Sequence, residues 1–337
     1  GTGDQGLQAY CFRMCLTDDR KNQLPWTAPE GYDPARYELL LRTFDGGADQ
    51  VPWNIVHMPN RKSDVNNNGA VSTDYIGGNH GYIEASDEER QRIIAEHLHW
   101  QQGLIWTLAT HPRVPRSVQV TTQQWRRAAD EFTDNDGWPW RIYVREGRRM
   151  VSTMVMNENH VRGKRKVGDP VGLASYGMDS HHVHRRAVDG FVRNEGDVQV
   201  GVFSPWPISY RSITPPPRSC SNLLVPVAIS ATHISYGSAR MEPVFFVLGE
   251  SAGIAAALAI REKTSVQQLP YPLLKKHLLK ARQVLSRKIT ADGTGQNEGI
   301  DPTTLEGTIV DELDEGVRLS SHWDISNSVK GFVGLCY

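Results

Sequence analysis

The residues most capable of catalysis or metal binding are three closely spaced histidines, His181, His182 and His184, which follow Asp179 and Ser180. Histidine changes its charge near neutral pH, so it is a common acid-base group and metal ligand. If this segment is extended, His182 and His184 share one face. No second histidine or cysteine cluster with metal-ligand spacing accompanies them. We predict no metal site, and we predict His181 and His184 as catalytic residues; the alternative is a polar surface loop.

A second candidate site is the pair Tyr210 and Arg211, which precedes the run Pro215-Pro216-Pro217. Proline fixes its own φ angle, so this segment is expected to be rigid. The guanidinium of arginine is always charged and offers a planar fork of donors to an anionic or carbonyl oxygen. We predict that Arg211 holds a substrate and that Tyr210 is a neighbouring catalytic residue. An ordinary surface arginine is the alternative.

The first six residues, Gly1-Thr-Gly-Asp-Gln-Gly6, match the dinucleotide-binding pattern G-x-G-x-x-G. That pattern requires a strand before it and a helix after it. Nothing precedes Gly1, and residues 7–16 are rich in aromatic and apolar residues with partial alternation, which indicates a strand. A glycine-rich loop is the better interpretation.

The segment Asp64 to Gly69 matches the first half of a calcium loop, D-x-N-x-N-G. Such a loop closes with a bidentate carboxylate at its twelfth position. Tyr75 stands there and offers none. We predict a polar loop folded by its own Asx turns, without calcium.

Charge and composition restrict the partner. The formal net charge is -1, whereas nucleic-acid binding requires a clustered excess of Lys and Arg. No apolar run has the length of a membrane span, and no signal-peptide pattern follows Gly1. The four cysteines (Cys11, Cys15, Cys220 and Cys336) form no C-x-x-C pair, so they leave the compartment open. We therefore expect a small-molecule partner, no nucleic acid and no membrane.

The elements that must position these residues begin with a long helix. Ser86 and Glu89 form a capping box, and apolar residues then recur at helical spacing up to His111. A second helix is predicted over residues 141–158. Residues 20–85 are rich in Pro, Gly, Asn and Asp, which favours ordered loop. Residues 167–213 contain short runs typical of strands, such as 198–203.

The C-terminal part changes character. The run 222–229 is apolar and has the length of a strand buried on both faces. A helix is predicted over 243–260, with Pro243 in its first turn and a small-residue face that allows close approach of a sheet or a cofactor. The free amides where it begins favour negative charge. Leu274 to Leu285 mark a further amphipathic helix.

The stretch from Asn222 to Gly253, which includes Ser230-Ala-Thr-His-Ile-Ser-Tyr-Gly-Ser-Ala-Arg-Met-Glu-Pro243, resembles the bacterial FAD-dependent oxidoreductase family found in polysaccharide-degrading organisms. The resemblance spans about 1 to 285. Its other segments are Gly3-Asp4 with Gln8 to Arg13, Pro59 to Gly69, Ser72 to Asp74, Val144 to Arg149, and Pro207 to Ser212. Relatives often carry Gly-Arg-Cys where this chain reads Pro226-Val-Ala228.

This resemblance implies FAD as the cofactor and an α/β (α+β) fold: a partial, discontinuous FAD-binding domain of glutathione-reductase type with a mixed helical and β substrate domain. It also implies that the βαβ unit for the ADP half lies before this chain. The turn after residue 229 would then line the flavin. The residues implied to bind the cofactor are Ser230, Thr232, His233, Gly237, Ser238, Arg240, Met241, Pro243 and Val244.

The expected domain layout follows from these elements. Residues 307–337 resemble the start of a golvesin or xanthan-lyase-associated accessory domain, which would place the parent protein near polysaccharide and outside the cytoplasm. The segments are 1–80 (strand and loops near flavin and substrate), 81–165 (mainly helical insertion), 166–220 (β-rich substrate segment), 221–288 (late strand and helices of the FAD domain), 289–306 (linker) and 307–337 (truncated accessory domain).

The leading functional hypothesis is hydride transfer from a small-molecule or carbohydrate-derived substrate to FAD. The first alternative is a cofactor-free polysaccharide lyase, in which Tyr210 or His181 is the base and Arg211 neutralises a uronic carboxylate. The second is a carbohydrate-binding scaffold that uses the nine tryptophans. The small-residue helix after an apolar strand favours a nucleotide-type sheet and hence the flavoenzyme.

Overall fold

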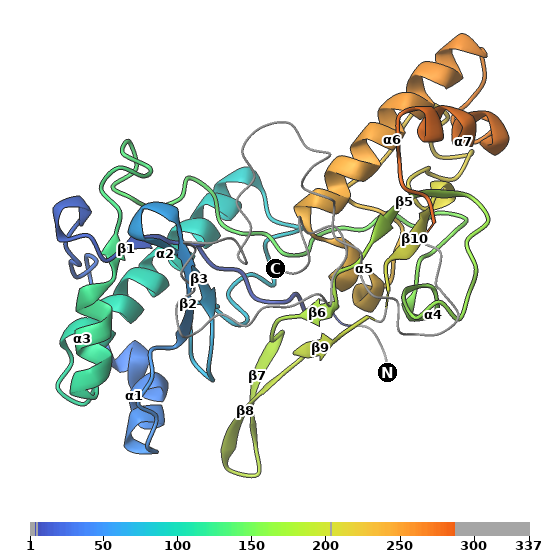
Figure 1. Ribbon diagram of the computed structural model, residues 1–337. Coiled ribbons are helices and arrows are strands. Elements are labelled where there is room, and N and C mark those ends of the chain that lie inside the picture. Colours follow the sequence, from blue (N-terminus) through green and yellow to red (C-terminus); the bar gives the residue numbers. More distant parts are fainter. Residues whose placement is uncertain (1–3, 5, 203, 287–337) are drawn as a thin grey trace, which may run out of the picture. The chain divides into compact units, whose positions relative to one another are not determined.

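The computed structural model describes Asp4 and residues 6–202 and 204–286 (Figure 1). All of them belong to one compact unit, Gly1–Ser286. The predicted linker and accessory domain, 289–306 and 307–337, lie outside the described residues, as do Gly1 to Gly3. Both helices and strands are present, which confirms the α/β class.

A four-stranded antiparallel sheet has the order β2 (Trp53–Met58), β3 (Lys62–Asn67), β1 (Cys15–Thr17), β4 (Arg126–Arg127). The prediction of loop over 20–85 is therefore wrong for β2 and β3, and the Asx-turn loop at Asp64 is strand. The two strands turn through η3 (Pro59–Arg61), where Asn60 and Arg61 have φ angles of 63° and 57°. Polar residues concealed the strand, because only Ser63 and Val65 face the core.

The helices α1 (Glu38–Asp45), α2 (Asp87–Thr110) and α3 (Arg116–Gln124) share the first hydrophobic core with this sheet. The predicted start of α2 is confirmed. The Glu89 amide donates to Ser86 Oγ at 3.3 Å, and the Ser86 amide donates to Glu89 Oε2 at 2.9 Å. Two short 3-10 helices, η1 (Arg20–Asn22) and η2 (Pro34–Tyr37), precede them.

Six short strands follow in the second half of the unit, and each pairs antiparallel with its partner. β5 (Pro170–Ala174) pairs with β10 (Trp206–Ser209), β6 (Met178–Ser180) with β9 (Val198–Val200), and β7 (His184–Val188) with β8 (Phe191–Glu195). The β-like run at 198–203 is thus confirmed in its first three residues. The last pair is a tight hairpin, because Asp189 and Gly190 both have positive φ angles.

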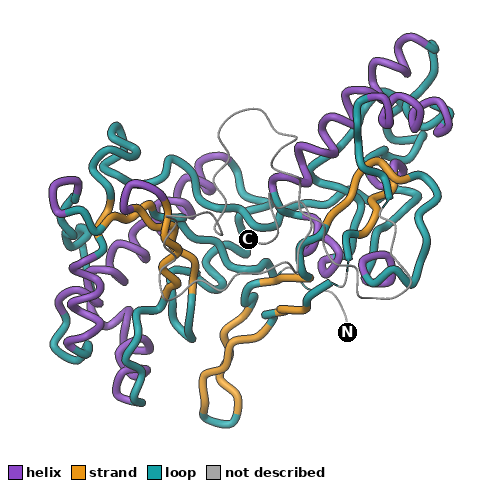
Figure 2. Tube along the Cα trace, viewed as in Figure 1, coloured by secondary structure: helices purple, strands orange, loops and turns teal. Residues whose placement is uncertain are grey.

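The predicted helix over 141–158 is wrong. The structure has no helix between β4 and α4 (Glu158–Val161) (Figure 2). The segment is extended and bonds to distant backbone: the Tyr143 amide donates to Cys11 O at 2.8 Å, and the Met156 amide donates to Ser230 O at 2.9 Å. This conformation buries Arg145 and Glu146, whose partners lie in other segments, so tertiary contacts override local helix preference.

The predicted strand over 222–229 is also wrong. Leu223 and Val227 are 47% and 49% exposed, and burial begins only at Ile229. A single parallel bridge joins Ala231 to Met156. Pro226 has no amide donor, so this run cannot complete a ladder of backbone bonds. η4 (Tyr210–Ser212) precedes the run, and α5 (His233–Ala239) follows it.

The predicted helix over 243–260 is confirmed as α6 (Glu242–Arg261), with Pro243 in its first turn. The helix predicted over 274–285 is α7 (Tyr271–Lys280), which begins earlier and ends before Leu285. α6 packs on β5 through Ser251, whose hydroxyl donates to Val171 O. Its length and composition would also allow it to cross a membrane, but core helices satisfy the same criterion. This helix therefore assigns no location.

Candidate active site

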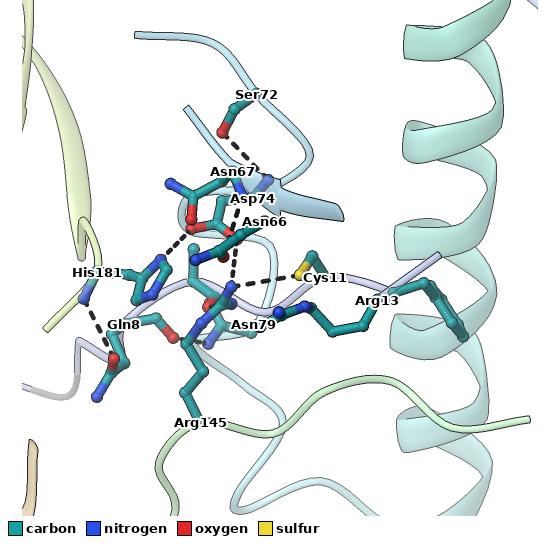
Figure 3. Close-up of polar contacts among 12 residues, drawn as sticks. Gln8, Cys11, Arg13, Asn66, Asn67, Ser72, Asp74, Asn79, Arg145 and His181 are labelled. Carbon is teal, nitrogen blue, oxygen red and sulfur yellow. Dashed lines mark hydrogen bonds and ion pairs between the residues drawn. The ribbon is translucent and has the colours of Figure 1, made fainter. Parts of the chain in front are cut away.

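The carboxylate of Asp74 lies at the centre of a buried polar network (Figure 3). Asp74 is 2% exposed, and its Oδ2 is 2.7 Å from Nδ1 of His181. Its Oδ1 is 3.0 Å from Nη2 of Arg145, whose side chain is fully buried. The three residues come from distant parts of the sequence, so the fold alone assembles them. A buried carboxylate needs such partners to remain charged.

The pKa shifts define the protonation states of this pair. Burial alone would raise the pKa of Asp74, but Arg145 and the hydrogen bond with His181 hold it below the ordinary value. Burial lowers the pKa of His181, and Arg145 adds to this effect despite the carboxylate. At neutral pH Asp74 is therefore ionised and His181 neutral. An ionised carboxylate only accepts hydrogen bonds, so the proton of His181 is assigned to Nδ1.

A second histidine–carboxylate pair lies next to the first. Nδ1 of His233 is 2.7 Å from Oε2 of Glu146, a residue that is 4% exposed. Gln8 joins the two pairs: its Nε2 donates to Glu146 Oε2 at 3.0 Å, and its Oε1 accepts from the His181 amide at 3.2 Å. Arg149 completes the cluster through an ion pair with Glu146.

The network continues from His181 to a further ion pair. Nε2 of His181 is 3.8 Å from Oδ2 of Asp179. Asp179 in turn pairs with Arg240, which is 6% exposed. Two carboxylates, Asp74 and Asp179, therefore flank a neutral imidazole, and each carboxylate pairs with its own arginine. Both carboxylates have a cationic partner, which offsets the cost of burying them.

Two cavities flank the segment Glu146 to Arg148, which lines both of them. The larger cavity, of about 820 Å³, includes His80, His184, His233, Arg149, Glu84 and Glu195 in its wall. The smaller cavity, of about 330 Å³, includes Tyr143, Arg145, Tyr236, Arg240, Glu242 and Phe245. Both volumes fall in the range of small-molecule sites.

The residues predicted to bind the cofactor are divided between these cavities and the packing around them. Instead of an open turn, they form α5 and the start of α6. His233 lines the larger cavity and Arg240 the smaller. Met241 is the N-cap of α6 and makes no side-chain cap bond. Pro243 and Val244 occupy the first turn of α6, and Val244 is buried.

The other four predicted cofactor residues are involved in local packing. Thr232 caps α5 by accepting from the Ser235 amide at 3.4 Å. The buried hydroxyl of Ser238 accepts from Trp206 Nε1 at 2.8 Å. Ser230 is fully buried, and its hydroxyl accepts from the Ser152 amide at 3.0 Å. A Cβ on Gly237 would lie 2.5 Å from the carbonyl oxygen of Asp179, so no larger residue fits there without a shift.

The residues predicted to be catalytic are not all together. His184 lines the larger cavity, with Nε2 2.9 Å from Asp4 Oδ2 and its ring 4.9 Å from that of His80. Arg211 pairs with Asp169, at 3.0 Å from Nε and 3.4 Å from Nη2. Tyr210 is buried and donates to Val266 O. Neither Tyr210 nor Arg211 lines either cavity.

Sequence reasoning assigned no site role to the polar partners, namely Gln8, Asp74, Arg145, Glu146 and Asp179. The first four lie in segments that carried the family resemblance, and this was the available signal. Nothing in their spacing indicated that they would meet. Within the described residues, no group of three His, Cys, Asp or Glu side chains is arranged to hold a metal ion. Asp64, from the calcium-like segment, is instead paired with Arg13, whose Nε lies 3.1 Å from its Oδ1.

Comparison with known proteins identifies the protein family. A sequence model of the family described as FAD dependent oxidoreductase matches residues 1–278. This match covers most of the chain, and the chain therefore belongs to the FAD dependent oxidoreductase family. No curated protein and no solved structure matched the chain significantly. The family assignment favours an FAD-dependent oxidoreductase over the lyase and scaffold alternatives.

Proposed function

We propose that this chain binds the flavin half of FAD and that the protein transfers a hydride to it from a carbon of a small, hydroxyl-bearing substrate of the carbohydrate class. The observation that carries this proposal is the position of the segment from His233 to Phe245. It contributes side chains to the walls of both cavities, so two ligand-sized spaces adjoin one segment and one buried network. A flavoenzyme requires such adjacent sites for cofactor and substrate.

The smaller cavity fits a flavin ring by its chemistry. Tyr236 and Phe245 supply aromatic wall. Nε of Arg240 is a buried donor without a hydrogen-bond partner in the described part of the chain. α6 begins at Met241 without a side-chain cap, so its first amides and its dipole favour an electron-rich edge. When bound, FAD supplies a two-electron acceptor for hydride.

These features assign the predicted cofactor residues to two roles, contact with the edge of the flavin ring and formation of the wall beside it. Arg240, Met241, Pro243 and Val244 would hold the polar edge of the ring. Ser230, Thr232, His233, Gly237 and Ser238 would shape the wall that contains α5 beside it. The larger cavity would take the substrate. Its wall carries side chains of both charges together with three histidines, which suits a polar, neutral ligand such as a sugar.

Side chains of this protein would accept the proton that the substrate hydroxyl releases. Oxidation of a hydroxyl to a carbonyl releases a hydride from carbon and a proton from oxygen. A histidine near the substrate can accept that proton, and His181 and His184 are the candidates from the sequence. Arg211 would hold the substrate only after leaving Asp169, because its planar fork already binds that carboxylate.

We further propose that the ADP half of FAD is bound by a βαβ unit of glutathione-reductase type that lies outside the described residues. Support for this proposal comes from α6, whose outer face is apolar and is not covered by the other described residues. Phe246 and Ile260 are 78% and 80% exposed. A Cβ on Gly249 or Gly253 would meet no atom within 4 Å. Such a face suits close packing against another layer.

We also make proposals for the other segments of the chain. We retain 81–165 as a mainly helical insertion, 166–220 as a β-rich substrate segment, 289–306 as a linker, and 307–337 as the start of an accessory domain associated with polysaccharide. That last proposal would make the parent protein an exported one.

The test is the cofactor content of the protein encoded by the full reading frame. We expect it to purify with FAD, at about one flavin per chain, and to show a flavin absorption spectrum. The 337-residue chain should hold FAD weakly or not at all, since it would contact only the flavin half. A colourless full-length protein that added FAD cannot reconstitute would overturn the proposed function.

A further inference from the structure

We propose that His233 is the catalytic residue that accepts the substrate proton, through Nε2, and that Glu146 is the residue that positions it. This inference rests on the proposed function and selects one histidine from those around the larger cavity. It departs from the sequence, which suggested His181 and His184 for this role and His233 for cofactor binding.

The geometry of the pair is that of an oriented imidazole. Nδ1 of His233 lies 2.7 Å from Glu146 Oε2. The same Oε2 accepts from Gln8, and an ionised carboxylate can only accept hydrogen bonds, so the ring proton is assigned to Nδ1 of His233. Nε2 is then the unprotonated atom. The His233 side chain is 35% exposed and lines the larger cavity, and Nε2 makes no hydrogen bond within the described residues.

Glu146 is held so firmly that it can fix the ring. Gln8 Nε2 and Arg149 bind its carboxylate, and the Tyr10 hydroxyl donates to its backbone carbonyl. His233 is itself the first residue of α5, directly after the N-cap Thr232. Each member of the pair is therefore positioned by its own set of bonds, and this is the condition for an effective positioning residue.

The other two histidines are less suited to the role. Nε2 of His181 faces the Asp179 carboxylate at 3.8 Å, and His181 is not part of the wall of either cavity. Nε2 of His184 is occupied by Asp4 at 2.9 Å, and that carboxylate is 60% exposed. Among the described histidines, only His233 combines a buried carboxylate on one nitrogen with an open second nitrogen at the larger cavity.

The surrounding charges keep this imidazole neutral and able to accept a proton. Burial lowers the pKa of His233, and the nearby Arg149 and Arg240 lower it further. Glu146 acts in the opposite direction by stabilising the imidazolium once it forms. The titratable and charged groups that share the larger cavity are Asp4, His80, Glu84, Glu146, Arg148, Arg149, His184 and Glu195.

The proposed step is balanced. The O–H bond of the substrate hydroxyl breaks, and its proton forms a new N–H bond at Nε2 of His233. A bound flavin would supply the acceptor for the carbon-bound hydrogen and its electron pair, and the substrate would become a carbonyl compound. Nδ1–H stays directed at Glu146 throughout, so the carboxylate transfers no proton.

The test uses the full-length protein and three substitutions: Glu146→Gln, His233→Gln and, as a control, Glu158→Gln. Glu158 carries the same chemical change, but it lines neither cavity and its carboxylate pairs with Arg162. Long-range nitrogen–proton NMR of the imidazoles reports tautomer and pKa without any substrate. Rapid-mixing flavin reduction by a competent sugar, followed over pH, reports catalysis.

We expect the unsubstituted protein to show His233 as the Nδ1–H tautomer. Glu146→Gln should lower the pKa of His233, mix its tautomers and slow flavin reduction on the order of 10²-fold. His233→Gln should slow reduction similarly and remove the matching limb of the pH profile. Glu158→Gln should leave the tautomer and pKa of His233 and the rate of flavin reduction unchanged.

The inference is wrong if Glu146→Gln leaves the tautomer and pKa of His233 unchanged, or if His233→Gln reduces its flavin at the parent rate with the same pH profile. Flavin absorbance of the same samples tests the proposed function separately. Loss of FAD from all of them would reject the flavoenzyme, whereas normal FAD content with an indifferent His233 would reject only this assignment.

Discussion

The carboxylate of Asp74 lies 2.7 Å from Nδ1 of His181, although 107 positions separate the two residues in the sequence. Arg145 approaches the same carboxylate from a third segment, at 3.0 Å. This contact ties the loop after β3 to the end of β6 and to the extended segment before α4. It fixes the relative positions of the parts of the chain that surround both cavities.

Asp74→Asn should therefore destabilise the fold. The substitution leaves the fully buried Arg145 without a charged partner, and breaking a buried pair in this way costs about 3–5 kcal/mol. Urea unfolding followed by circular dichroism measures the change. Asp64→Asn is the matched control, because its partner Arg13 is 30% exposed and such pairs contribute about 1 kcal/mol or less. Equal effects of the two substitutions would show that burial does not distinguish these pairs.

Acidification should destabilise the protein, starting near the ordinary histidine pKa of 6.5. Burial lowers the pKa of His97, His160, His181 and His233, so the unfolded chain binds protons at a pH where the folded chain does not. The free energy of unfolding is then constant above this pH and falls as pH decreases through it. Asp74, whose pKa is also lowered, adds to the loss only at more acidic pH, below its ordinary value of 3.8. Urea midpoints between pH 8 and pH 5 check the sign, and a midpoint that rises on acidification would contradict it.

Gly237→Ala should distort α5, because the added Cβ would lie 2.5 Å from the backbone oxygen of Asp179. We expect a loss of about 1–3 kcal/mol, typical of overpacking, and reduced FAD content in the full-length protein. Gly249→Ala is the contrasting change. Its Cβ meets nothing within 4 Å, so the 337-residue chain should gain about 0.5–1 kcal/mol.

The same Gly249→Ala change tests the proposed packing on α6. If a βαβ unit covers this face in the full-length protein, the substitution should destabilise that protein while stabilising the shorter chain. Thermal unfolding of both lengths gives the comparison. A gain of the same size in both would argue against any close layer on α6.

Arg211→Lys should slow flavin reduction by substrate without changing FAD content. Lysine keeps the charge but loses the planar fork that would bind a substrate oxygen in two places. Rapid-mixing reduction measures the rate. Arg211 also binds Asp169, so Asp169→Asn serves as the control for loss of that pair. If Arg211→Lys reduces its flavin like the parent, Arg211 is only the structural partner of Asp169.

The sequence determined the elements whose signals are local. Ser86 and Glu89 predict the start of α2 because a capping box needs only residues three apart, and Pro243 with the apolar run after it predicts α6. The sequence also indicated the protein family, because the stretch from Asn222 to Gly253 that resembles this family is long and specific. The histidines around His181 could be identified as chemically capable, but which of them faces a cavity could not.

Which residues form the buried polar network is determined only by the tertiary structure. Asp74, Glu146 and Arg145 have no recognisable spacing, because ion pairs between distant segments leave no periodic pattern in the chain. For the same reason residues 143–156 were predicted as helix although they are extended: their backbone bonds and buried charges are satisfied by segments around Cys11, Asp74 and Ser230. Local helix preference is worth a few tenths of a kcal/mol per residue, whereas leaving a buried charge unpaired costs several. The pairing of buried charges therefore sets the conformation here, and it depends on partners that the fold alone brings together.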